Sequence, residues 1–120
     1  MAKIKNFIDL DAWREGHKLV LEIYKITNNF PNEEKFGLTS QIRRCTVSIT
    51  SNIAEGFSRK TNKDKIKFYI ITLGSLTELQ NQIIISKDLG YITKSKYDDI
   101  YNQIIKIQKI TNGLIRYLKK

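Results

Sequence analysis

Apolar residues recur at helical spacing in four successive segments, and this pattern constrains the fold more than any other feature of the sequence. In the first segment, from about Asp11 to Asn28, Leu19, Ile23 and Ile26 form one apolar row. Such a row gives a helix one face to bury. Composition agrees, because one Pro and six Gly are too few for the turns of a β-sandwich of 120 residues. The chain is therefore predicted to be all-α.

The other three segments repeat the pattern and carry signals for their ends. We expect these helices at about Asn32 or Leu38 to Phe57, Thr61 to Leu89, and Thr93 to Leu118. Asp9 or Asp11 is expected to cap the first helix, and Gly90 to end the third in a left-handed conformation. Four helices with short loops in a single domain, residues 1–120, predict an antiparallel up-down-up-down four-helix bundle.

The first and last helices are apolar over more than one stripe. Beside the main row of the last helix lies a second row, made of Tyr97, Tyr101, Ile105 and Ile115. A monomeric bundle needs only one buried face per helix, so we expect the second face to be buried between subunits of a homo-oligomer. The alternative is that isoleucine is scattered over the surface by composition bias.

Residues suited to catalysis or metal binding are few. Cys45 lies in the apolar row between Ile42 and Ile49, where burial raises a thiol pKa and makes it inert. His17, one turn from Trp13, is interpreted as a packed or rim residue. One Cys and one His exclude a disulfide framework and the usual zinc sites, and no phosphate-loop or metalloprotease motif is present. We therefore expect no enzymatic activity and no cofactor.

The second helix carries an unusual polar row, which has a structural and a functional interpretation. Its members are Gln41, Arg43, Arg44, Ser48, Asn52 and Glu55. The structural interpretation packs them against Gly74, Ser75 and Glu78 of the third helix, with one arginine paired to Glu78. The functional alternative is a polar pocket or a nucleic-acid groove.

The positive charge is concentrated in two segments. The first contains Arg59, Lys60, Lys63, Lys65 and Lys67, and the second contains Lys106, Lys109, Arg116, Lys119 and Lys120. The surplus in these two segments equals the whole net charge of +9, so the rest of the chain is balanced. Such a surplus favours a polyanionic partner. The alternative is a merely solvated loop and tail.

Nothing in the sequence indicates secretion or a membrane. The opening lysines are followed by no apolar run, and uncharged stretches such as Phe68 to Thr77 are too short to span a bilayer. A single Cys fits a reducing compartment. We expect a cytoplasmic protein with no membrane partner.

Three runs carry a resemblance to a known family: DLDAWREGHKLVLEIYKITNNFP, EKFGLTSQIRRCTVSITSNIAEGFSR and ITLGSLTELQNQIIISKDLGYI. In this order they resemble the bacterial four-helix-bundle family first described from intervening sequences in large-subunit ribosomal RNA genes. The resemblance covers about Phe7 to Leu118. One departure is Thr50, where the family usually has Pro.

The resemblance implies a cytoplasmic, non-enzymatic bundle that assembles as a ring, which we expect to be a pentamer. A similar protein is the accessory variability determinant of diversity-generating retroelements, a basic pentamer that associates with a reverse transcriptase and with nucleic acid. Two hypotheses follow. The first is a basic homo-oligomer that binds RNA or DNA non-specifically through phosphates, and the second is a scaffold that docks a protein such as a reverse transcriptase.

Overall fold

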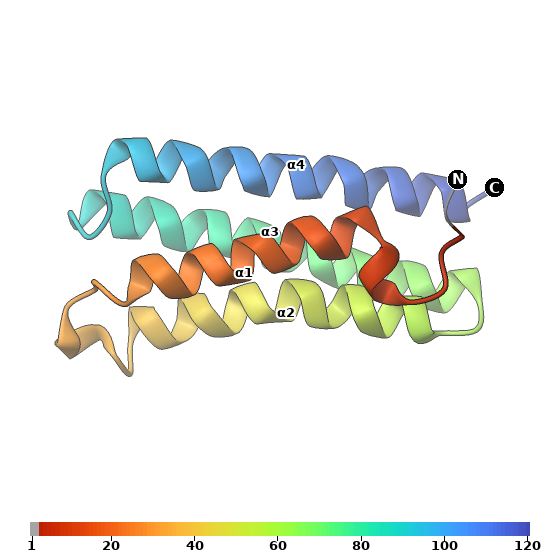
Figure 1. Ribbon diagram of the computed structural model, residues 1–120, viewed down its shortest axis with the longest axis horizontal. Helices are drawn as coiled ribbons and strands as arrows, with labels where there is room; N and C mark the ends of the chain where they lie inside the picture. Colours follow the sequence, from red (N-terminus) through yellow and green to blue (C-terminus); the bar gives the residue numbers. More distant parts are fainter. Residues whose placement is uncertain (1–2) are drawn as a thin grey trace.

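Four long helices lie along the long axis of the molecule in the computed structural model, which describes residues 3–120 (Figure 1). They are α1 (Asp11–Thr27), α2 (Leu38–Ser58), α3 (Asn62–Asp88) and α4 (Lys94–Leu118), with short 3₁₀ helices η1 (Phe7–Asp9) and η2 (Asn32–Glu34). The molecule measures 45 × 25 × 21 Å. No strand occurs in the described part of the chain. The all-α prediction is confirmed, and the expected helices agree with the observed ones to within a few residues.

Each helix packs on its two neighbours around the bundle. α1 contacts α2 and α4, and α3 also contacts α2 and α4. Consecutive helices run in opposite directions along the long axis in Figure 1. α1 and α3 therefore lie diagonally opposite, and their outer faces look away from each other.

The core lies between the four apolar faces. Its fully buried side chains come from all four helices and include Leu19, Ile23, Ile42, Ile49, Ile53, Tyr69, Leu76, Leu79, Ile83, Ile100, Ile104 and Ile107. These positions follow the rows predicted from helical spacing except at the start of α3, where Tyr69 is buried and the predicted Ile70 is exposed. Burying isoleucine and leucine away from water is the main force that holds such a bundle together.

The helix ends carry the local signals that the sequence predicted, with one exception. Thr61 accepts a hydrogen bond from the Asp64 amide at 3.1 Å, and Gly90 has a φ of 80°. The exception is α1, whose N-cap is Leu10 without a side-chain cap. The Asp9 carboxylate instead accepts the amides of Lys5 and Asn6 and closes η1. These hydrogen bonds lower the pKa of Asp9.

Gly56 marks the closest approach of α2 to α3. A Cβ at this position would lie 2.7 Å from Tyr69 Cε1 and 3.0 Å from Phe68 Cβ. Tyr69 is fully buried and has no room to move.

We expect Gly56→Ala to lower the free energy of unfolding by about 2 kcal/mol, because overpacking forces the two helices apart. Thermal denaturation should show a midpoint roughly 8 °C lower. The matched control is Gly113→Ala, where a Cβ meets nothing closer than 3.7 Å. That change should stabilise α4 by about 0.5–1 kcal/mol, because alanine is the better helix former. An unchanged midpoint for Gly56→Ala would show that α2 and α3 can move apart enough to fit the added methyl group without loss of stability.

The exposed apolar surface only partly follows the prediction, because α1 exposes Leu21 and Tyr24 as an extra apolar face would, whereas α4 does not expose its whole second row. Ile115, predicted to lie in a second row of the last helix, is buried in the core with 7% exposure. The other members of that row, Tyr97, Tyr101 and Ile105, are half-buried. The prediction placed Ile115 wrongly because the last turns of α4 pack fully against the bundle.

α3 also carries four exposed isoleucines on one side, in two pairs separated by Gly74, Thr77, Glu78 and Asn81, and we call these four side chains the apolar stripe of α3. Ile70, Ile71, Ile84 and Ile85 are 54%, 50%, 36% and 40% exposed. Between Lys67 and Lys87 the only charged residue in the sequence is Glu78. Other exposed apolar side chains are Leu21 and Tyr24 on α1, Phe36 in the connection between α1 and α2, and Val47 on α2.

Candidate nucleic-acid interface

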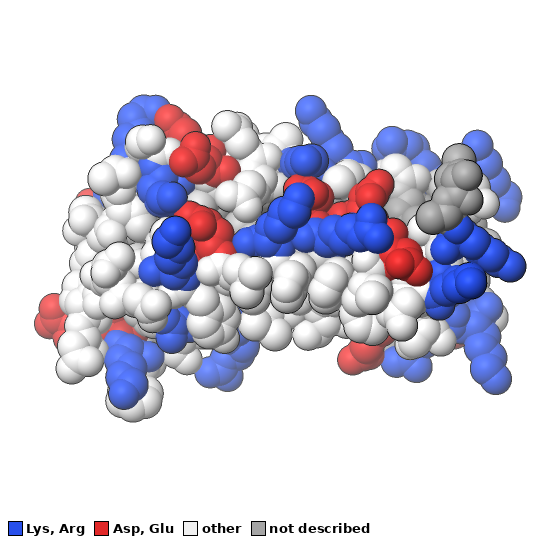
Figure 2. All heavy atoms as spheres, viewed as in Figure 1, with Lys and Arg blue, Asp and Glu red and all other residues white. Residues whose placement is uncertain are grey.

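The two basic segments meet at one end of the molecule. The connection between α2 and α3, the last turn of α4 and the start of the chain all lie at this end (Figure 1). The Asn62 side-chain amide donates to the Leu118 carbonyl at 3.2 Å and ties α3 to α4. We call this region the basic end and define it by Lys3, Lys5, Arg59, Lys60, Lys63, Lys67, Arg116, Lys119 and Lys120. In Figure 2, blue side chains gather there, whereas red ones are mixed among the blue elsewhere.

Two cations of the basic end have carboxylate partners. Arg59 pairs with Glu55 at 3.3 Å and covers the Phe68 ring at 4.5 Å, and Lys67 lies 3.9 Å from Asp64. All four charged groups are strongly exposed, so these pairs contribute little to stability. Their cations can exchange a carboxylate for a phosphate.

Lys65 has a structural role, although the sequence grouped it with the binding residues. Its ammonium donates to the Phe57 carbonyl and lies over the Phe57 ring. That carbonyl is in the last turn of α2, where a positive charge is favourable. Lys65 therefore supports the junction of α2 and α3 and is set apart from the basic end.

Lys106 and Lys109 lie several turns before the end of α4. The Lys106 ammonium is 3.3 Å from the Glu15 carboxylate of α1. Lys18, and after it Lys106, lowers the pKa of Glu15. Lys106 thus helps to join α1 to α4, while Lys109 is exposed on the same half of α4 as the basic end.

Lys60 and Lys63 occupy positions at which a cation does not stabilise the fold. Both are exposed, and within residues 3–120 neither has an ion-pair partner. Lys63 lies in the first turn of α3, where a positive charge opposes the helix dipole. By contrast, the cations at the end of α4 are at a favourable helix C-terminus. An anion bound beside Lys63 would relieve the unfavourable contact.

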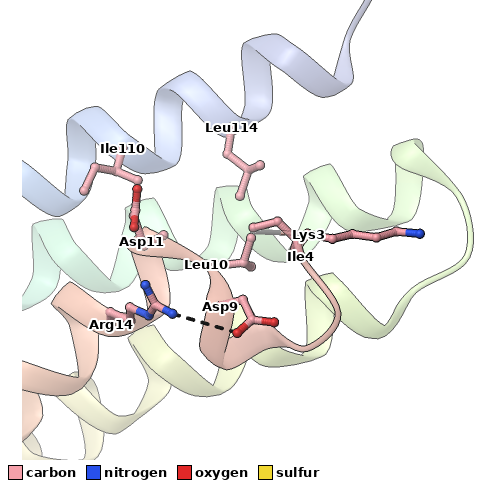
Figure 3. A pocket seen from close by; sticks show the side chains of 9 residues that line it. Lys3, Ile4, Asp9, Leu10, Asp11, Arg14, Ile110 and Leu114 are labelled. Carbon is pink, nitrogen blue, oxygen red and sulfur yellow. Dashed lines mark ion pairs between the residues drawn. The ribbon is translucent and has the colours of Figure 1, made fainter. Parts of the chain in front are cut away.

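A hollow of about 460 Å³ lies beside the basic end, between the start of α1 and α4 (Figure 3). Its floor is apolar and includes Leu10, Ile110 and Leu114. Asp9 and Asp11 stand at its edge. Lys3 and Arg14 also line the hollow, so its two cations are balanced by the two carboxylates, and we place no anion inside it.

In the polar row of α2, Arg43 holds α1. Its guanidinium donates to Thr27 Oγ1 at 2.8 Å and to Asn28 Oδ1 at 3.0 Å, and it covers the Tyr24 ring at 4.7 Å. These groups lie at the C-terminal end of α1, where a cation is favourable. The predicted pairing of an arginine with Glu78 is wrong. Arg43 reaches α1 instead, and the Arg44 guanidinium donates to Ser40.

The rest of the row is divided between packing and surface. The Ser48 and Ser75 hydroxyls are hydrogen-bonded, with 2.7 Å between their Oγ atoms. The predicted contact with Ser75 of the third helix is therefore confirmed. Asn52 donates back to the Ser48 carbonyl. Gln41 and Arg44 line an open hollow of about 530 Å³ together with Glu78. Glu55 belongs to the pair with Arg59.

Cys45 is buried, as predicted. Its side chain is 5% exposed, and its Sγ donates to the Ser75 carbonyl at 3.1 Å. Burial, with a smaller effect of the Glu78 carboxylate, raises the pKa of the thiol to about 12. At neutral pH the thiolate is therefore scarce, and the thiol is unreactive.

We expect native Cys45 to react with a thiol reagent only as fast as the bundle opens, and the denatured chain to react at once. Cys45→Ala should lower the free energy of unfolding by about 1 kcal/mol, because it removes one small buried group. Labelling kinetics followed with and without denaturant check the first expectation, and denaturant titration checks the second. Labelling of the native chain as rapid as that of the denatured chain would contradict the burial.

Other kinds of site find no support in the described residues. No group of three or more His, Cys, Asp or Glu side chains within residues 3–120 is placed to hold a metal ion. The His17 ring stacks on Trp13 at 4.7 Å, in keeping with its interpretation as a rim residue. None of the helices within the same residues combines the length and the apolar character needed to cross a membrane.

The sequence interpretation missed two members of the basic end, Lys3 and Lys5. They are more than 50 positions from the nearest basic segment, so local clustering could not reveal them. The available signal was topology, because an even number of antiparallel helices brings both termini to one end. The Lys3 side chain in Figure 3 extends toward the connection between α2 and α3.

Comparison with known proteins gives a family and a similar fold. The family model described as 23S rRNA-intervening sequence protein matches residues 8–113. A similar fold occurs in the crystal structure of a protein of unknown function from the S23 ribosomal protein family of Bacteroides thetaiotaomicron VPI-5482, with a TM-score of 0.80. The two chains are 23% identical, and the match covers 87% of this chain and 97% of the other. No curated protein matches.

Proposed function

The chain belongs to the 23S rRNA-intervening sequence protein family, as its motifs predicted, and on this premise we propose that it is a non-enzymatic nucleic-acid-binding protein. The basic end contacts the phosphates of RNA or DNA. The single observation that carries the proposal is the meeting of two sequence-distant basic segments at one end of the bundle. Contacts to phosphates depend on charge alone, so the protein should bind nucleic acids of any base sequence.

Assembly strengthens this function. We propose that up-down-up-down bundles associate as a homo-oligomer through the apolar stripe of α3. A ring needs two different complementary faces on each subunit. The isoleucines of α3 could form one such face, and the exposed Leu21 and Tyr24 of α1, the helix diagonal to α3, could form the other. The resemblance favours five subunits. Repeating the basic end around a ring multiplies weak phosphate contacts through avidity.

The second candidate is a protein-docking scaffold in the cytoplasm, for example one that holds a reverse transcriptase. The observation in its favour is the same apolar stripe of α3, which a partner protein could cover in place of another subunit. Under this hypothesis the positive charge attracts an acidic protein surface.

The experiment that separates the two candidates measures the affinity of the protein for two labelled oligonucleotides of equal length and unrelated sequence. The proposed function predicts that both bind with dissociation constants equal to within about threefold, because phosphate contacts carry no base code. Absence of binding at low salt would overturn the proposed function and favour the scaffold. A strong preference for one sequence would contradict recognition through phosphates alone.

A further inference from the structure

An aromatic side chain stands uncovered within the basic half of α4. Tyr117 is 70% exposed. It lies between Arg116 and Lys119, and Lys120 follows one turn later. Within residues 3–120, no aromatic or cationic group covers the Tyr117 ring, and its hydroxyl makes no hydrogen bond.

The surface beside this ring is also open. Helical side chains lean back over the preceding turn, so Tyr117 covers the turn that contains Gly113. Gly113 has no side chain, and a Cβ there would meet only Arg116 Nη2, at 3.7 Å. A flat group could therefore approach the ring with a guanidinium beside it.

We propose that Tyr117 is a stacking platform for an unpaired base, so that the basic end prefers single-stranded nucleic acid to duplex. This inference rests on the proposed function, because the neighbouring cations must first hold the phosphates. A base inside a duplex is already stacked on its neighbours, whereas an unpaired base can lie on an exposed aromatic ring. Stacking of this kind tolerates every base, which agrees with binding that is non-specific in sequence.

The test compares three probes of equal length: a single-stranded oligothymidylate, an abasic strand with the same number of phosphates, and a duplex. We expect Tyr117→Ala to weaken binding of the oligothymidylate by about tenfold, a typical effect for one stacked base. Binding of the abasic strand and of the duplex should stay within about twofold. Tyr117→Phe keeps the ring and should bind all three probes like the parent.

Gly113→Leu provides a second variant that leaves every charge and the tyrosine unchanged. The added side chain fills the space beside the ring and should weaken oligothymidylate binding alone. An equal effect of Tyr117→Ala on all three probes, or none on any, would overturn the stacking site while the proposed function stands. If the parent protein binds none of the probes, the proposed function fails first.

Discussion

Replacing Lys60, Lys63 and Lys119 together by glutamate is expected to weaken binding of RNA and DNA by about 100-fold at low salt. Each exposed cation that contacts a phosphate adds roughly one counterion to the salt dependence of binding. The slope of log affinity against log salt should therefore fall in magnitude by about three. The loss should be equal for unrelated sequences, because phosphate contacts carry no sequence information. Fluorescence anisotropy across several salt concentrations measures both quantities.

The fold should survive this triple change. All three side chains are exposed, and within the described chain none has an ion-pair partner. Glutamate at position 63 also places a negative charge in the first turn of α3, where the helix dipole favours it. Lys65 is left unchanged because it supports the end of α2.

The matched control reverses Lys25, Lys35 and Lys94, three exposed cations at the opposite end of the bundle. Net charge changes by the same amount, but these positions lie at the far end of a molecule 45 Å long, which exceeds the Debye length of about 10 Å at 0.1 M salt. The control should lose no more than about threefold in affinity. If both triple variants lose affinity equally, net charge rather than the basic end drives binding.

Placing glutamate at both Ile71 and Ile85 is expected to dissociate the proposed oligomer into single chains of 14.0 kDa. Both side chains lie in the exposed stripe of α3. Each side chain is about half exposed, so its burial between subunits contributes about 1 kcal/mol, and loss of two weakens association by on the order of 30-fold. Burying the new carboxylates would add a further penalty. Light scattering over a range of concentrations measures the assembly.

The control for assembly is the pair Asn102→Glu and Asn112→Glu on α4. Both positions are exposed, and the change adds the same two charges away from the α3 stripe. This variant should remain assembled. A parent protein that scatters as one chain at every concentration would show that α3 does not bind another copy, and the scaffold would become the leading hypothesis.

Sequence reasoning located the helices well because their ends depend on local chemistry. Thr61, Thr93 and Gly90 act within one turn of their own positions, so a pattern of neighbours is enough to find them. The core rows were equally predictable, because helical spacing fixes which residues share a face.

The faces between helices were harder to assign. α3 is apolar on nearly every side, and its sequence alone does not say which row meets the bundle. The prediction therefore put the extra apolar surface on α1 and α4, which holds for Leu21 and Tyr24 but not for Ile115, and missed Ile71 and Ile85. The partners of Arg43 and Lys65 were not predicted either, because long side chains reach helix ends that are distant in the sequence.

The candidate site was predictable in its parts but not in its assembly. Both basic segments were evident from charge alone. Their meeting depends on the return of α4 to the start of α3, which the contact between Asn62 and Leu118 records. Tyr117 drew no attention in the sequence, because its exposure is known only once α4 is oriented.

The most direct test of phosphate binding at the basic end is the affinity of the unmodified protein for one labelled oligonucleotide as salt is raised. At least four exposed cations per subunit are available, so the slope of log affinity against log salt should be about −3 or steeper. If the basic end binds phosphates, affinity should fall steeply as salt is raised, with a slope of that size. No binding at low salt, or a slope near zero, would contradict it.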